Sequence, residues 1–170
     1  MRTKLALAGL LVVAAVAVGC GGGSIPKPAG VASEETDGSG TRLIAVDDAN
    51  RALHGYDPVA YFTVGMAKPG SAEFTTEWAG ATWQFAMAEH QAAFEADPEK
   101  YAPQYGGYCA WGVAAKNDLF DVDPEAWRVV DGKLYLNYNA EVQSTWVEDI
   151  PGFITKGDQN WPTLADSKAG

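Results

Sequence analysis

The stretch Trp127-Arg-Val-Val-Asp-Gly-Lys-Leu-Tyr-Leu-Asn137 carries the clearest structural signal in the chain. Two runs of aromatic, β-branched and leucine residues flank the pair Asp131-Gly132. An Asp-Gly pair favours a type I′ turn, whose two central residues both have positive φ, and this turn joins adjacent antiparallel strands. The stretch therefore predicts a β-hairpin that turns at Asp131-Gly132.

A second hairpin is predicted upstream of the first. Residues 73–78 and 82–87 are rich in β-forming side chains, and they flank Ala79-Gly80-Ala81. A glycine between two such runs is typical of a short hairpin connection. Two hairpins with helix-favouring segments after them indicate an α+β protein rather than a parallel sheet.

Helices are predicted after each hairpin. Residues 88–96 have a helix-favouring composition, and His90 and Phe94 share one helical face at i, i+4 spacing. Asp97-Pro98 ends this helix or begins a short second one. Residues 141–149 form a further amphipathic helix. The predicted fold is a single compact α+β domain with two β-hairpins, two or three short helices and long ordered loops.

The N-terminus has the pattern of a bacterial export signal. Arg2 and Lys4 precede an apolar run over residues 5–18, which is too short for a typical spanning helix. The run ends in Ala17-Val18-Gly19-Cys20, which resembles the bacterial lipobox and implies a lipid-modified, palmitate-bearing Cys20. The alternative is an ordinary secretory signal that is cut near Gly19. We expect residues 1–19 to be a lipoprotein signal peptide.

A flexible tether is predicted to follow the lipidated cysteine. Residues 20–41 contain mostly Gly, Ser, Pro, Ala and acidic residues, which offer almost nothing to bury. A coil of this length has an r.m.s. span of roughly 25 Å. The sequence therefore predicts a folded domain at residues 42–166 that a lipid anchor holds at the membrane, outside the cytoplasm, facing the periplasm or the cell surface.

The charge of the chain limits its partners. It contains 12 Lys and Arg against 22 Asp and Glu, for a net charge of −10, and ten against 22 without Arg2 and Lys4, for −12. A protein this acidic repels polyanions. Nucleic acid and anionic lipid headgroups are therefore excluded as binding partners, and the membrane is contacted through the lipid anchor; no protein partner can be named.

Several motifs follow one another in a characteristic order: Gly-Tyr-Asp-Pro-Val-Ala-Tyr-Phe at 55–62, Trp-Gln-Phe-Ala-Met-Ala-Glu-His at 83–90, Tyr-Gly-Gly-Tyr-Cys-Ala at 105–110, Asp-Gly-Lys-Leu-Tyr-Leu-Asn-Tyr at 131–138 and Asn-Trp-Pro at 160–162. Together they resemble bacterial YHS domain-containing proteins, in particular the longer subfamily, over residues 46–164. Small YHS domains have a treble-clef-like core, and several are linked to copper or other heavy metals. The resemblance therefore implies a YHS-type, treble-clef-like core and a metal-binding module.

The chain departs from the metal-binding pattern of that family. The usual pattern has one cysteine after Asp-Pro-Val and two in a Phe-Cys-Ser-x-x-Cys segment. The corresponding residues here are Ala60, Ala86 and His90. Two of the three thiolates are missing, and only the third residue can still bind a metal.

A soft-metal site is nevertheless predicted from the remaining donors. Cu(I) prefers Cys, Met and His in low coordination number, whereas structural zinc needs four nitrogen or sulfur ligands. Cys109, His90 and His54 are sufficient for a copper site if the fold brings them together. The function predicted from the sequence is therefore a membrane-tethered module that binds or handles copper, without turnover.

Each of these residues also has a simpler interpretation. Free cysteine is among the most buried residue types, so Cys109 can be inert, or it can be a redox-active thiol. His90 can be a hydrogen-bonded core histidine, and His54 can shape the turn that follows it.

Two other classes of function remain open. A thiol enzyme would need Cys109 to have a depressed pKa, and the acidic surroundings favour the opposite. A scaffold or ligand-binding lipoprotein would instead use exposed Trp and Tyr side chains on Gly-rich loops, without a metal.

Overall fold

The hairpin predicted at residues 127–137 forms as β3 (Asp123–Val130) and β4 (Lys133–Asn137), which pair antiparallel. Asp131 has a φ of 50° and Gly132 a φ of 74°, so both turn residues are left-handed, as the Asp-Gly pair predicts.

The computed structural model describes residues 42–168. The predicted signal peptide, Cys20 and the tether lie outside these described residues.

The second predicted hairpin is also present. Strand β1 (Ser71–Trp78) pairs antiparallel with β2 (Ala81–Phe85), and the turn residues Ala79 and Gly80 have φ values of 52° and 79°. Each hairpin forms its own two-stranded sheet. The predicted α+β class with two hairpins is therefore confirmed.

The helices after the first hairpin lie where the sequence places them. Helix α2 (Ala88–Ala96) ends at Asp97, and α3 (Pro98–Tyr101) begins at the next residue. The Asp97 carboxylate accepts a hydrogen bond from the Lys100 backbone N–H, at 3.3 Å. Pro98 needs no N–H partner at the first helical position, so Asp97-Pro98 both ends one helix and starts the next.

More helix is present than the two or three short helices predicted. Five α-helices occur in residues 42–168, and they include a four-residue helix, α1 (Ala60–Thr63). Helix α4 (Ala140–Trp146) continues through a 3-10 turn (Val147–Asp149) into α5 (Ile150–Lys168). Helix α5 runs to Lys168, two residues beyond the predicted end of the domain at residue 166.

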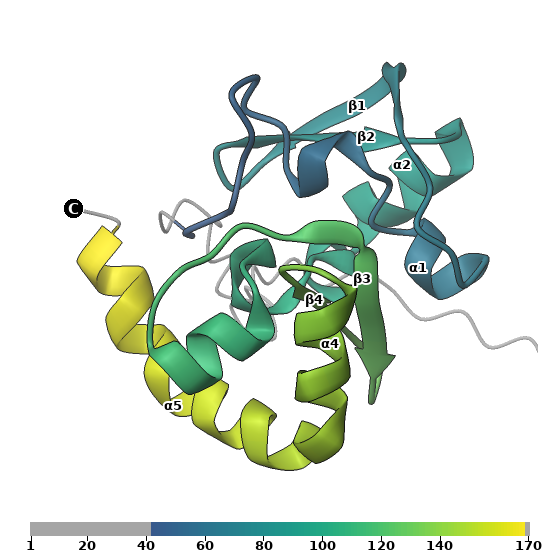
Figure 1. Ribbon diagram of the computed structural model, residues 1–170. Coiled ribbons are helices and arrows are strands. Elements are labelled where there is room, and N and C mark those ends of the chain that lie inside the picture. The colour runs from purple at the N-terminus through teal and green to yellow at the C-terminus, as the bar shows by residue number, and fades with distance from the viewer. Residues whose placement is uncertain (1–41, 169–170) are drawn as a thin grey trace, which may run out of the picture. The chain divides into compact units, whose positions relative to one another are not determined.

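Three short helical turns complete the fold: η1 (Leu53–Gly55), η2 (Gln104–Gly107) and the π-helical turn η3 (Gly112–Lys116). In Figure 1 the hairpin of β1 and β2 lies with α1 and α2 in the upper half of the view, and β4, α4 and α5 lie below. Helix α5 packs against η3.

Two aromatic clusters form the core. In the first, the ring centroids of Trp83 and Phe85 lie 4.9 and 5.3 Å from that of Phe94, and all three residues are fully buried. In the second, the Tyr135 ring lies 5.4 Å from Trp146. Aromatic side chains therefore supply the core of both halves of the domain, since each buries a large apolar area.

Gly106 allows the start of the described chain to pack closely on η2. Its φ is +60°, and a Cβ atom at this position would collide with the Leu43 carbonyl oxygen. The Gly106 carbonyl also accepts a hydrogen bond from the Ala45 backbone N–H, at 2.8 Å. Only glycine satisfies both the backbone conformation and the close contact.

None of the helices in residues 42–168 has the length and hydropathy that a membrane-spanning segment needs.

Candidate functional site

Asp57 is the centre of a buried polar network. Its Oδ1 accepts the backbone N–H groups of Val59, at 2.9 Å, and Ala60, at 3.3 Å. Its Oδ2 accepts the N–H of Ala86, at 2.9 Å, and lies 2.6 Å from His90 Nδ1. The carboxylate is completely buried. Because the three backbone partners all donate, both oxygens of the Asp57 carboxylate act as acceptors, and an ionised carboxylate needs His90 Nδ1 to donate as well.

The other ring nitrogen of His90 is engaged as well. His90 Nε2 lies 3.1 Å from Thr63 Oγ1, which in turn lies 3.0 Å from the Val59 carbonyl oxygen. Asp57, His90 and Thr63 thus stand in the order of a hydrolase triad, in which a hydroxyl passes its proton to an imidazole. Here the single hydroxyl hydrogen has two acceptors, one of them in its own helix. We interpret the network as structural: its hydrogen bonds hold α1, the end of β2 and α2 together.

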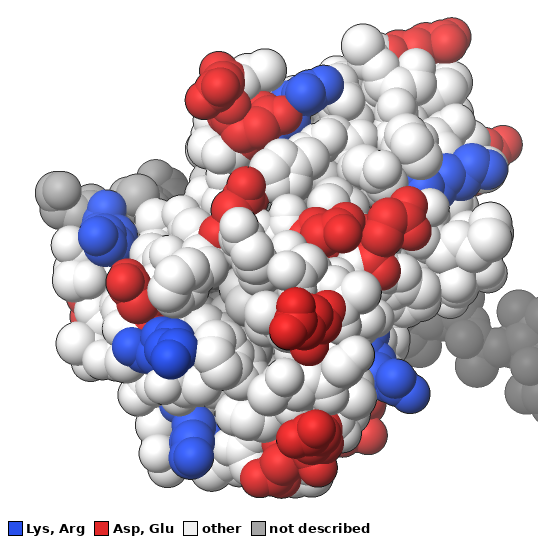
Figure 2. Space-filling view, viewed as in Figure 1, with Lys and Arg blue, Asp and Glu red and all other residues white. Residues whose placement is uncertain are grey.

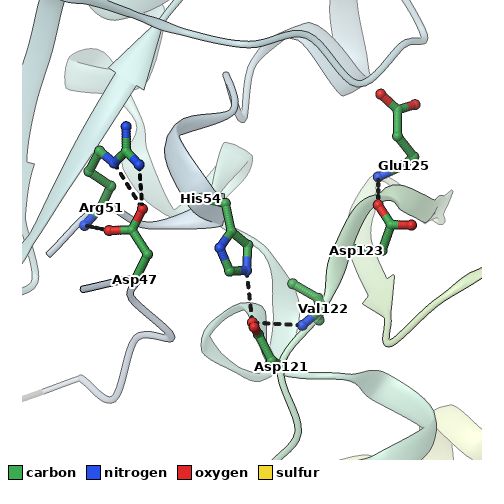
Figure 3. A network of polar contacts seen from close by, with 7 residues as sticks. All are labelled: Asp47, Arg51, His54, Asp121, Val122, Asp123 and Glu125. Carbon is green, nitrogen blue, oxygen red and sulfur yellow. Dashed lines mark hydrogen bonds and ion pairs between the residues drawn. The ribbon is translucent and has the colours of Figure 1, made fainter. Parts of the chain in front are cut away.

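His54 belongs to a different network at the surface. Its Nε2 lies 2.8 Å from Asp121 Oδ1, which also accepts the Val122 backbone N–H, at 2.8 Å (Figure 3). The two side chains are 33% and 65% exposed. The contact joins η1 to the loop before β3. The nearby pair of Asp47 and Arg51 in Figure 3 is a separate contact within one loop.

Figure 2 shows that acidic side chains are numerous on the face of the molecule that it draws. Asp and Glu side chains gather in several groups on the face drawn, with Lys and Arg side chains between and around them.

Cys109 lies in a third environment. The residue is 1% exposed, its Sγ accepts the Gly112 backbone N–H at 3.4 Å, and Asn137 Oδ1 lies 3.9 Å away. Burial raises the pKa of the Cys109 thiol, although the backbone N–H groups of Gly112, Tyr138 and Trp111 act in the opposite direction. The thiol is therefore protonated at neutral pH, which weakens it as a nucleophile.

A cavity of about 320 Å³ opens beside the Cys109 thiol. Phe120 and Tyr138 are 40% and 54% exposed, so large aromatic surfaces at this cavity face solvent. Within residues 42–168, the lining consists of Cys109, Trp111, Lys116, Phe120, Tyr138 and Val142. Exposed apolar surface around a concave site is typical of a binding site.

Lys116 is the one charged side chain among the lining residues. Its ammonium lies 5.1 Å from the centroid of the Trp111 ring, over the ring. It forms no ion pair with a carboxylate of residues 42–168. The cavity thus combines apolar walls with one cation that a protein carboxylate does not neutralise.

The three predicted metal ligands do not form one preformed site in the described domain. His90 contacts Asp57, His54 contacts Asp121, and Cys109 contacts backbone and Asn137. Residues 42–168 contain no group of three or more His, Cys, Asp or Glu side chains placed to hold a metal ion. A copper ion shared by the three predicted ligands would therefore have to displace the hydrogen bonds of His90 and His54.

The sequence interpretation missed the walls of the cavity. The lining residues Lys116, Phe120 and Val142 lie up to 26 positions apart along the sequence, and no periodic pattern connects them. The role of Asp57 could have been recognised, because Asp before Pro and an apolar residue is a frequent start of a helical turn.

Comparisons of the chain with protein-family models, with curated proteins and with solved structures found no match.

Proposed function

We propose that this chain is a lipid-anchored protein of the bacterial cell envelope whose YHS-type domain binds a small apolar ligand beside Cys109. The cavity supports the proposal, since four of its six lining side chains are Trp111, Phe120, Tyr138 and Val142. Its volume is at the lower end of the roughly 300–1,000 Å³ that is typical of small-molecule sites. Desolvation of the exposed aromatic rings by a ligand would supply the binding free energy.

The anchor in this proposal is Cys20. The apolar run over residues 5–18 and the lipobox-like Ala17-Val18-Gly19 support export and lipidation. Stable attachment to a membrane needs at least two hydrophobic signals, which a multiply acylated cysteine supplies. The Gly-rich residues that follow would let the domain meet ligands in the space next to the membrane.

Copper binding is a second candidate, which Cys109 alone favours. A thiol is a soft ligand, and a metal could enter from the cavity that the sulfur lines. The hydrogen bonds of His90 and His54 weigh against their service as the other ligands. We therefore favour binding of an apolar ligand.

A titration of the chain from residue 20 onward, with Cys20→Ala to avoid detergent, tests the proposal. We expect 1-octanol to shift the NMR signal of the Trp111 indole in a saturable way. Val142→Trp fills the cavity and should abolish this shift, whereas Val64→Trp, at a 48% exposed position just after α1, should not. Saturable binding that survives Val142→Trp would overturn the proposal.

Anaerobic titration with Cu(I) against a competitor probe separates the two candidates. The copper candidate predicts tight binding that Cys109→Ser and His90→Ala both weaken. Binding of octanol without such copper binding supports the apolar-ligand proposal, and the opposite pattern contradicts it.

A further inference from the structure

We infer that the ligand of the Cys109 cavity is a small amphipathic acid with one carboxylate, which binds with its carboxylate at Lys116 and its apolar body against Trp111, Phe120 and Tyr138. This inference rests on the proposed function and specifies the class of ligand.

The lining of the cavity defines the apolar part of the ligand. The Trp111 ring is partly buried, whereas Phe120 and Tyr138 expose a large share of their surface. Val142, on α4, completes the apolar walls. A hydrocarbon chain or a single ring system would cover these surfaces, at roughly 25 cal/mol per Å² of apolar area buried.

The Lys116 ammonium defines the charged part. Two other cations of the described domain already have carboxylate partners, because Arg42 pairs with Glu99 and Arg51 with Asp47. Lys116 contacts the face of the Trp111 ring instead. Its remaining donors are free to bind a carboxylate, and hydrogen bonds between two charged groups are stronger than neutral ones.

The net negative charge of the protein favours a ligand that carries a single negative charge. The chain has a net charge of −10, and only one cation lines this cavity. The field of such a protein repels multiply charged anions such as phosphates. For an acid with a single carboxylate, this repulsion costs the least binding free energy. The apolar body of the acid then supplies most of the affinity.

Cys109 provides a neutral surface for the apolar body of the ligand. The sulfur is buried, and it accepts a backbone N–H rather than facing a cation. A protonated thiol behaves as a small hydrophobic group. The cavity therefore combines one cation, Lys116, with apolar side chains and a neutral thiol, which matches the two parts of an amphipathic acid.

A matched pair of ligands tests the inference. Octanoate and 1-octanol share one chain length and differ in charge, and both are titrated into the Cys20→Ala chain from residue 20 onward by calorimetry and NMR. We expect octanoate to bind roughly tenfold more tightly than octanol at low salt, as a charged hydrogen bond allows. Added salt should reduce this difference.

Lys116→Gln supplies the residue-level test. It should remove the roughly tenfold advantage of octanoate over octanol, which is the ratio of the two affinities measured on the same variant. Lys156→Gln, at an exposed position on α5, is the matched control and should change neither affinity. Lys116 itself is exposed, so the substitution should not disturb the fold.

The outcomes separate this inference from the proposal beneath it. The acid specificity would be overturned if octanoate and octanol bound with equal affinity, or if Lys116→Gln left the advantage of octanoate intact. In either case, binding of octanol would still support the proposed function. Failure of both ligands to bind would overturn both.

Discussion

The Asp57 network and the Cys109 cavity both contain a buried polar side chain, yet their surroundings differ in every other respect. All the contacts of the Asp57 carboxylate are with protein donors, and both ring nitrogens of His90 have partners. Cys109 instead lines an open cavity with exposed aromatic walls and with Lys116, which forms no ion pair with a carboxylate of residues 42–168. The hydrogen bonds of the Asp57 network are all made to other groups of the protein. The cavity, in contrast, leaves apolar surface that a ligand can cover.

This difference separates structural residues from candidate binding residues better than residue type does. His90 is a residue that the resemblance to YHS domains predicts as a metal ligand, but both of its ring nitrogens already have protein partners. Buried groups with satisfied partners stabilise the fold, and breaking such a set is costly. Unsatisfied, accessible groups are the ones that a ligand can contact.

Asp57→Ala should have the largest effect on stability. The substitution leaves three backbone N–H groups and the His90 ring without their acceptor in a buried place. We expect the free energy of unfolding to fall by about 3–5 kcal/mol, as for a broken buried ion pair. Urea denaturation followed by tryptophan fluorescence would measure it, and a loss below about 1 kcal/mol would contradict the structural role of the network.

Alkaline pH should have a smaller effect that does not involve the Asp57 network. Burial raises the pKa of Tyr135 to about 12, from an ordinary value of 10. The unfolded chain then releases its Tyr135 proton first, so the contribution of Tyr135 to stability is constant below pH 10 and is lost between pH 10 and 12. Urea midpoints at pH 9 and 11.5 measure the loss.

Tyr135→Phe is the control for this alkaline loss, since phenylalanine has no proton to release. The variant should lose less stability than the wild type over the same pH interval. An identical loss in both proteins would show that the Tyr135 hydroxyl is not responsible.

Cys109→Ala should cost only about 1 kcal/mol, the typical effect of a single substitution, because the sulfur contacts few polar groups. The enlarged cavity should keep its affinity for octanol. Urea denaturation and the octanol titration together test the contrast with Asp57. A loss as large as that of Asp57→Ala would place Cys109 among the structural residues.

His54→Gln should have the smallest effect. Its contact with Asp121 is exposed, and surface ion pairs contribute about 0–1 kcal/mol. High salt should reduce even this contribution. The same urea experiment at low and high salt would detect it, and a loss above about 2 kcal/mol would refute a purely peripheral role.

Local signals made both hairpins and two helices predictable. Asp131-Gly132 specifies a turn through its own backbone preferences, and Asp97-Pro98 ends one helix and begins the next. Neither depends on the rest of the fold. Helix α5 was missed because it contains Pro162 in its interior, along with Gly157, and packing against η3 outweighs their low helix propensity.

The candidate site was less predictable because it depends on tertiary contacts. Asp57 and His90 are 33 residues apart, and the i, i+4 pattern of α2 places His90 on the inner face without naming its partner. The cavity walls come from η3, the loop before β3 and α4. A sequence can mark Cys109 and His90 as unusual, but only the fold assigns them to different environments.

The close packing at Gly106 has a mechanical consequence for an anchored protein. The first described residues, which would directly follow the proposed tether, are hydrogen-bonded to the domain through Ala45 and Gly106, and Arg42 is paired with Glu99. Tension on the anchor would therefore load these contacts first, together with the contact of the Arg42 guanidinium with the Trp78 ring of β1. Because the buried Ile44 belongs to the same cluster as Trp83 and Phe94, the force would reach the core within two residues of Arg42.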